Sequence, residues 1–220
     1  MKFLSGISSL LLMLLLPFSS YALSADDDVD QVKKALKSLE KEFKNIKSIA
    51  SDFTQTKKMS LFNRNIILKG RLLIKFPHYF RWEVDEPVKT TVTASGDSIK
   101  IWDEESGETQ TTSTKNNPVV KNIWAQIDSW FMGKYLLLAK DYNISTLKNE
   151  ETESDIPLLV FKPKSKPLSV AVQSVTLYFE KATPETSGRQ YLKRVILKEK
   201  SGDSTVIDFD NVKISLQSKQ

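Results

Sequence analysis

After residue 52 the apolar residues of this chain stop recurring every three or four positions and begin to alternate with polar ones. Successive side chains of a strand point to opposite faces, so a period of two predicts strands with one buried face. Turns at Pro77, Pro87 and 95–97 separate the alternating runs and predict an antiparallel meander. The runs begin at Phe53 with Gln55 and continue over 66–74, 80–84, 88–93 and 98–102.

Two other stretches keep the period of an amphipathic helix. The apolar residues concerned are Val32, Leu36, Leu39, Phe43 and Ile46 in the first stretch, and Ile123, Ile127, Trp130 and Phe131 in the second. The first predicts a helix of about five turns that begins near residue 30. We expect its apolar face to pack on the protein's own sheet, with partner binding as the alternative. Residues 135–139 predict one further helical turn.

The last third of the chain returns to strands, at 158–161, 170–179, 190–199 and 204–209, with a hairpin turn at 201–203. So many strands with so few helices predict a mainly β protein with helices (α+β). Its fold class is an incomplete, strongly curved antiparallel β-barrel whose apolar concave face is covered by helices.

Residues 1–22 have the composition of a cleaved signal peptide, with Lys2, an apolar run over 10–16 and a small-x-small ending at Ala22. We therefore expect residues 23–220 to form a single domain in the periplasm. The chain has no cysteine, so neither disulfides nor an N-terminal lipid anchor on cysteine are expected. Its basic residues are scattered, which argues against nucleic acid as a partner.

Catalytic chemistry finds little support in the sequence. His78 is the one histidine, and the absence of cysteine excludes a thiol nucleophile. Carboxylate pairs such as Asp103-Glu104-Glu105 fall in predicted turns, where solvated charge is the ordinary role. The seven glycines form no phosphate-binding loop. The sequence therefore predicts binding without catalysis, with no catalytic residue, cofactor or metal.

The stretch 70–87 predicts a one-sided hairpin. Leu72 and Ile74 share one face of their strand, and Phe80, Trp82 and Val84 share one face of the next, while charged residues take the other face. Two interpretations of the apolar face stay open: a filled core, or the lining of a cavity. The surplus of large aromatic residues favours the cavity.

In their order and spacing, these elements resemble the outer-membrane lipoprotein carrier protein family, LolA. The matching stretches are "SDFTQ" after an amphipathic helix, "LKGRLLIKFPHYFRWEVDEP", "TASGDSIKIWDEESG" and the closing "LKRVILKEKSGDSTVIDFDNVKI". The resemblance covers essentially the whole chain after the signal peptide.

The resemblance implies a soluble periplasmic carrier with an incomplete barrel closed by helices. Its hydrophobic cavity would hold the acyl chains of lipoproteins, or a lipid, and carry them from the inner to the outer membrane. The partners it implies are acylated lipoproteins, an inner-membrane lipoprotein-releasing transporter and an outer-membrane acceptor lipoprotein. The simplest expectation for such a shuttle is a monomer.

The sequence departs from the family at one position that matters for gating. Many members carry an arginine before the proline of the second motif, where it is thought to latch a lid, but this chain has Phe76. We expect a lid at 123–138 held by apolar contacts, and a surface role for Arg81. The expected lining of cavity and lid is Phe53, Leu72, Ile74, Phe76, Phe80, Trp82, Val84, Trp102, Ile123, Ile127, Trp130 and Phe131.

Rival functions from other classes remain at this point. A periplasmic lipid-binding sensor or protein-interaction module on the same fold would bind lipid or protein ends in order to signal. A structural module would have a filled core and no affinity for lipid. An enzyme would need a nucleophile and a base, for which the sequence offers no candidates.

Overall fold

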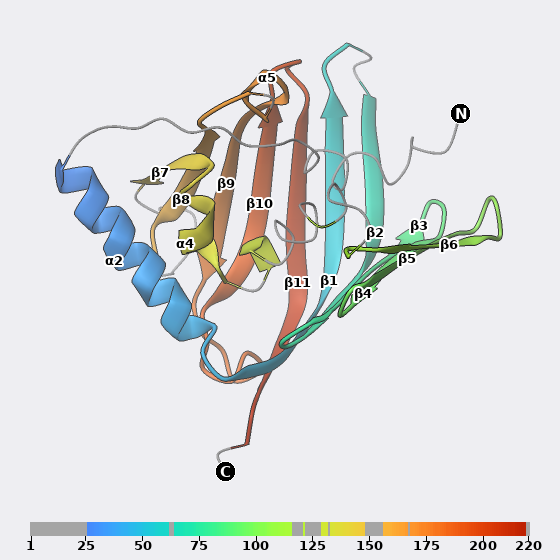
Figure 1. Cartoon of the computed structure of the whole chain (residues 1–220), viewed down its shortest axis with the longest axis horizontal. Helices are drawn as coiled ribbons and strands as arrows, with labels where there is room; N and C mark the ends of the chain where they lie inside the picture. The colour runs from blue at the N-terminus through green and yellow to red at the C-terminus, as the bar shows by residue number, and fades with distance from the viewer. Residues whose placement is uncertain are drawn as a thin grey trace.

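The computed structural model is a long, curved antiparallel sheet (Figure 1). It describes residues 26–61, 64–115, 121, 129–131, 133–147, 156–166 and 168–218. The predicted signal peptide, Ile123 and Ile127 lie outside these residues. No helix within the described ranges is both long enough and apolar enough to cross a membrane.

The first half of the sheet is the predicted meander with one strand added. Its strands are β1 (Ile46–Met59), β2 (Arg64–Lys75), β3 (Tyr79–Glu86), β4 (Thr90–Ser95), β5 (Ser98–Asp103) and β6 (Thr109–Ser113). Strand β6 was not predicted, because its threonine-rich sequence has no apolar alternation. It forms at one end of the strand order by pairing with β5, and its residues are exposed or only half-buried.

The second half contains β7 (Tyr142–Leu147), β8 (Leu158–Pro163), β9 (Val172–Glu180), β10 (Tyr191–Glu199) and β11 (Ser204–Leu216). Strand β7 was not predicted, and β11 continues seven residues beyond the predicted end at 209. Residues 168–171, which overlap the predicted start of β9, form the short helix α5 (Leu168–Ala171) instead.

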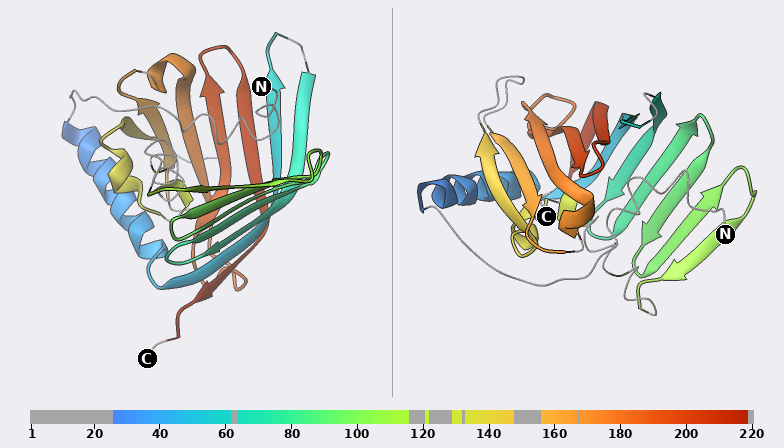
Figure 2. Two further views of the ribbon diagram at one scale, coloured as in Figure 1. Left: turned by 45° about the vertical axis from the view of Figure 1, so that its right-hand side comes forward. Right: turned by 90° about the horizontal axis from the view of Figure 1, so that it is seen from above.

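The strand order is β6-β5-β4-β3-β2-β1-β11-β10-β9-β8-β7, so the pair β1–β11 joins two meanders into one sheet. That order is open, with β6 and β7 at its two ends and no pairing between them among the described strands. Strands β3 to β6 run at a steep angle to β8 to β11, which gives the sheet its half-open shape (Figure 2). The predicted fold class, an incomplete and strongly curved antiparallel barrel with helices, is confirmed.

The amphipathic helix is α2 (Asp26–Glu42), and it packs on the protein's own structure as expected. Ala35, Leu36 and Leu39 are buried, and the helix contacts β7 and the short helix α4 (Tyr135–Leu138). The helix ends before the predicted Ile46, which opens β1. Asn45 has a φ of 61°, a left-handed conformation that stops a helix and that asparagine tolerates better than most residues.

Candidate functional site

The interior of the sheet holds two apolar clusters that lie side by side. The sheet cluster combines inward side chains of β1 to β5 and β11, among them Phe53, Leu72, Ile74, Phe80, Trp82, Val84, Phe209 and Ile214. The helix cluster combines α2, α4, α5 and β7 to β10, among them Leu36, Leu39, Tyr135, Tyr142, Phe161 and Phe179. Phe43, Leu192 and Val195 pack against both clusters and so mark the boundary between them.

The centre of the sheet cluster is an aromatic stack across three strands. The rings of Phe53 and Trp82 lie 3.8 Å apart at 23°, although β2 runs between their strands. Gly70 makes this possible, because it is the cross-strand partner of Phe53 on one side and of Val84 on the other. A Cβ at Gly70 would meet Phe53 Cζ at 2.7 Å and the Glu83 carbonyl oxygen at 1.9 Å. The glycine of "LKGRL" therefore leaves room for the stack.

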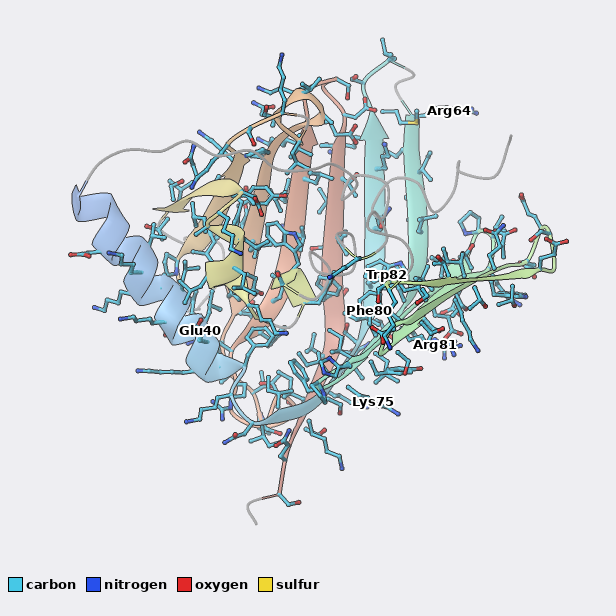
Figure 3. The ribbon with its side chains drawn as sticks, viewed as in Figure 1. Glu40, Arg64, Lys75, Phe80, Arg81 and Trp82 are labelled. Atoms are coloured by element: carbon cyan, nitrogen blue, oxygen red, sulfur yellow. The ribbon has the colours of Figure 1, made fainter. Side chains whose placement is uncertain are left out.

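The register of β2 with β3 confirms that the hairpin is one-sided. Leu72 pairs with Trp82 and Ile74 pairs with Phe80, and all four side chains are buried on the same face. Arg81 lies on the other face, where its Nε donates to Glu83 Oε2 at 2.7 Å, so the expected surface role is correct. Figure 3 shows Phe80 and Trp82 on one side of the strand and Arg81 on the other.

That opposite face carries a small ion network. Arg71 donates from Nη2 to Glu83 at 2.9 Å and to Asp85 at 3.1 Å. These carboxylates raise the pKa of the Arg71 guanidinium above its ordinary value, chiefly through the hydrogen bonds that Arg71 donates to Asp85. Arg71 of β2 is therefore paired with two carboxylates of the neighbouring strand β3.

A mid-chain segment, described at residues 129–131 and 133–138, enters the space between the clusters. The Phe131 ring lies 5.5 Å from Phe80 and 6.2 Å from both Trp82 and Phe209, so it belongs to the sheet cluster. The Trp130 ring lies 4.7 Å from Phe161 and 5.6 Å from Tyr142, so it belongs to the helix cluster. Two consecutive aromatic side chains thus join the two halves of the interior.

The direction of this segment is set by Gly133. Its φ is 73°, and the N–H of Lys134 donates to the Ser129 carbonyl at 3.1 Å, the 6→1 bond of a Schellman helix ending. A Cβ at Gly133 would lie 2.3 Å from Cγ of Phe43. Glycine is therefore required for both the backbone conformation and the close contact with the end of α2.

Tyr135 follows this turn and is fully buried in the helix cluster. Burial raises the pKa of its hydroxyl, so the phenol is neutral at any physiological pH. Among the residues that the structure describes, the hydroxyl has no hydrogen-bond partner. The ring instead packs edge-on against Phe43 and Phe179, at 6.0 and 6.2 Å.

Little space remains between the two clusters. A cavity of about 30 Å³ is lined by residues of both, including Ile74, Phe131, Tyr135 and Phe209. That volume admits roughly two water molecules, far below the roughly 300–1,000 Å³ of ordinary small-ligand pockets. In this structure the concave side is thus filled by the protein's own aromatic side chains. Trp130 and Phe131 fill the space that the side chains of the sheet leave open.

The structure brings together most of the residues predicted to line a cavity, but not all of them. Trp102 is in register with Thr91, which is in turn in register with Glu83, on the face opposite to the sheet cluster. Phe76 is half-buried at the β2–β3 turn and packs at the margin of the sheet cluster. Ile123 and Ile127 lie outside the described residues. Trp102 is therefore not a neighbour of the others.

Sequence reasoning missed Phe209 and Ile214, which line the same cavity from β11. Phe209 lies in a predicted strand but is not among the predicted site residues. Its spacing of two residues from Ile207 places both side chains on the same face and could have indicated an inward side chain. Ile214 was hidden by a register shift in the pairing of β1 with β11, where Asn211 has a φ of 52°. An irregularity of this kind moves the inward positions by one residue, so the alternation breaks in the sequence.

Comparison with known proteins places the chain in a family. Residues 44–220 match the model of the outer membrane lipoprotein carrier protein LolA, and the chain belongs to this family. A curated outer-membrane lipoprotein carrier protein of Francisella tularensis subsp. novicida is 26% identical over 194 residues, covering 88% of this chain and 79% of the relative. A second, from F. tularensis subsp. tularensis, is 27% identical over 170 residues, covering 77% and 73%. Among solved structures, a LolA superfamily protein from Nitrosomonas europaea is similar at 14% identity and a TM-score of 0.39, covering 90% of this chain and 96% of that one.

Proposed function

We propose that this protein is a soluble periplasmic carrier that shields the acyl chains of lipoproteins, or a lipid, and transfers them from the inner to the outer membrane. The observation that carries the proposal is the seating of Trp130 and Phe131 between two apolar clusters. Side chains from one segment cover an apolar surface formed by others. Withdrawal of that segment exposes the surface to a hydrocarbon chain. Family membership and the names of the curated relatives support the same function.

The energetics favour a lid that competes with its cargo. Burial of a methylene stabilises a complex by roughly 0.8 kcal/mol, so acyl chains held in a permanently open cavity would bind too tightly to be released. Cargo that must displace Trp130 and Phe131 loses the burial of these rings, roughly 1.5–3 kcal/mol for each fully buried large side chain. Uptake and release then come close to balance, as a transfer step needs.

The surface that cargo would contact is the inward face of the sheet cluster. Its proposed residues are Phe53, Leu72, Ile74, Phe80, Trp82 and Val84, with Phe76 at the margin. The proposed lid is the segment 123–138, to which Ile123, Ile127, Trp130 and Phe131 belong. None of these side chains carries a charge, so the contact with cargo is apolar and needs neither cofactor nor catalysis.

The rest of the proposal concerns the cell. Residues 1–22 act as a signal peptide and residues 23–220 work as one domain, a monomer that moves freely between the two membranes. An inner-membrane lipoprotein-releasing transporter delivers the cargo, and an outer-membrane acceptor lipoprotein receives it. The family description, which names an outer membrane lipoprotein carrier, supports this route.

The test is the identity of what the protein carries. We would purify the protein from a periplasmic extract without detergent and analyse co-purifying lipids and acylated proteins by mass spectrometry. The proposal predicts acylated cargo at near-stoichiometric amounts, and competition between that cargo and a fluorescent fatty-acid probe. A lipid-free protein that also fails to bind the probe would contradict it and would identify the aromatic surplus as ordinary core.

A further inference from the structure

At the tip of the β1–β2 hairpin, strand β2 is an edge strand of the sheet. The register of β2 with β3 begins at Lys69, so the β2 residues 64–68 pair with β1 alone among the described strands. On its other side β1 stays paired with β11, through Lys57 with Thr205 and Lys58 with Ser204, so among the described strands only the outer edge of β2 lacks a neighbour here. Residues 58–61 and 64–68, at this edge, are called the ribbon. Figure 3 shows Arg64 at this end of the molecule.

This ribbon exposes apolar side chains on both of its faces. Leu61 is 86% exposed, Ile66 is 46% exposed and Ile67 is 50% exposed. Ile66 and Ile67 are neighbours in a strand, so their side chains point in opposite directions. A flat partner surface would cover one of them and leave the other in water. Both are covered together only by a medium that wraps around the open edge of β2.

Hydrogen bonds connect the tip of the β1–β2 hairpin to the β10–β11 turn, and that turn to α5. Ser60 donates from its backbone N to Asp203 Oδ1 at 2.9 Å and from Oγ to the Ser201 carbonyl at 3.2 Å, which joins the tip to the β10–β11 turn. The N–H of Lys200 donates to the Ala171 carbonyl at 2.8 Å, which joins that turn to α5. Val170 of α5 is 59% exposed, so this end carries a fourth exposed apolar side chain.

The charge around these side chains is positive. Within residues 57–64 and 198–203, which form this end, five residues are basic and two, Glu199 and Asp203, are acidic. Lys58 and Arg64 are exposed on the ribbon, and Lys198 and Lys200 are exposed on the adjoining β10–β11 hairpin. Lys58 of β1 and Lys198 of β10 are both in register with Ser204 of β11, which lies between them. Their side chains therefore lie on the same face of the sheet. Basic side chains beside exposed apolar ones match the two parts of an anionic membrane surface, the headgroups and the acyl region beneath them.

We infer that the end formed by the β1–β2 tip, the β10–β11 turn and α5 docks the protein on an anionic lipid surface, with Leu61, Ile66 and Ile67 entering the headgroup region. This goes beyond the carrier proposal, because it concerns where the protein meets a membrane and not what it carries. A protein partner fits less well, since specific protein interfaces are extended patches of roughly 800 Å² per partner, whereas the exposed Ile66 and Ile67 lie on opposite faces of an edge strand.

The test is flotation of the protein with lipid vesicles. Vesicles of phosphatidylglycerol and phosphatidylethanolamine provide the anionic surface, and vesicles of phosphatidylcholine provide the neutral one. We expect binding to the anionic vesicles that weakens as salt is raised, and at least about tenfold weaker binding to the neutral ones. Failure of the unmodified protein to float with anionic vesicles would overturn the inference and leave this end as a surface for a protein partner.

Variants then assign the binding to the ribbon. Leu61→Ser combined with Ile66→Thr and Ile67→Thr removes the apolar side chains and keeps β-branched residues in the strand. Lys58→Glu with Arg64→Glu reverses the charge. Each set is expected to weaken vesicle binding by about tenfold or more, while Leu147→Ser, at a side chain 55% exposed on β7, changes it less than about twofold.

Binding of a fluorescent fatty-acid probe separates this inference from the carrier proposal. The ribbon variants should bind the probe like the unmodified protein, because their substitutions lie outside the sheet cluster. Equal vesicle binding by the ribbon variants and the unmodified protein would contradict the inference. Failure of the unmodified protein to bind the probe would instead count against the carrier proposal alone.

Discussion

Trp130 and Phe131 are adjacent in the chain but pack in different apolar clusters: the Trp130 ring lies 4.7 Å from Phe161, and the Phe131 ring lies 5.5 Å from Phe80. One short segment therefore holds the two halves of the interior together. Its removal would free a surface on each side at once, which is the arrangement expected of a lid whose side chains occupy the place of the cargo.

Truncation of the lid aromatic residue should separate stability from affinity. Phe131→Ala is expected to lower the free energy of unfolding by about 1–3 kcal/mol, less than the roughly 3–5 kcal/mol of a fully buried phenylalanine, because Phe131 is only half-buried. The same change should raise the affinity for a fluorescent fatty-acid probe, since the probe no longer displaces the ring. Urea denaturation and probe titration measure the two effects. A fall in both stability and affinity would mean that Phe131 supports the binding surface and does not compete for it.

Gly70 should be intolerant of even one added methyl group. Gly70→Ala places a Cβ against the Glu83 carbonyl and the Phe53 ring, and overpacking of this kind costs about 1–3 kcal/mol or more. Gly107→Ala is the matched control: Gly107 has a φ of 65° and nothing within 4 Å of its Cβ position, so its cost of about 1–2 kcal/mol is conformational only. Denaturation midpoints should rank Gly70→Ala below Gly107→Ala. The reverse order would show that the Phe53–Trp82 stack adapts without strain.

The hairpin 70–87 could be predicted from the sequence because its alternation is unbroken and one face is wholly apolar. The prediction that Trp102 lines the cavity is wrong. Ile99 and Ile101 point inward, and Trp102 is offset from them by an odd number of residues, so the alternation of the strand already indicates the outer face for Trp102. Strand β6 lacks any apolar signal and forms only because β5 offers it an edge. The filling of the concave side could not be predicted at all, because periodicity gives the direction of a side chain and not what lies opposite it.

Phe76 offers a test of how the proposed lid is held. Phe76→Arg replaces a half-buried apolar side chain at the margin of the sheet cluster with the arginine that the family resemblance leads us to expect there. We expect slower uptake and slower release of a fatty-acid probe, because an arginine can hydrogen-bond to backbone carbonyls of the lid. Stopped-flow fluorescence measures both rates. Unchanged rates would show that position 76 has no part in gating.

Acid should weaken the contact between the β1–β2 tip and the β10–β11 turn. The backbone N–H and hydroxyl of Ser60 donate to Asp203 and hold the pKa of its carboxyl below the ordinary 3.8. A carboxyl whose pKa is lower in the folded state stabilises the protein at neutral pH, and this stabilisation is lost as the pH falls through the lowered pKa. Asp203→Asn should therefore reduce stability at neutral pH but not at strongly acidic pH. An NMR titration midpoint for Asp203 at or above 3.8 would contradict the assignment.

The most direct test of the carrier proposal is to fix the lid in place. The chain contains no cysteine, so Phe80→Cys with Phe131→Cys introduces a unique pair that a short cleavable bismaleimide can join across the sheet cluster. The measurement is fatty-acid probe binding before cross-linking, after it and after cleavage of the linker, with each single-cysteine variant treated in the same way. We predict that the cross-link abolishes probe binding and that cleavage restores it. Undiminished binding by the cross-linked protein would show that the cargo site lies elsewhere and that Trp130 and Phe131 are ordinary core.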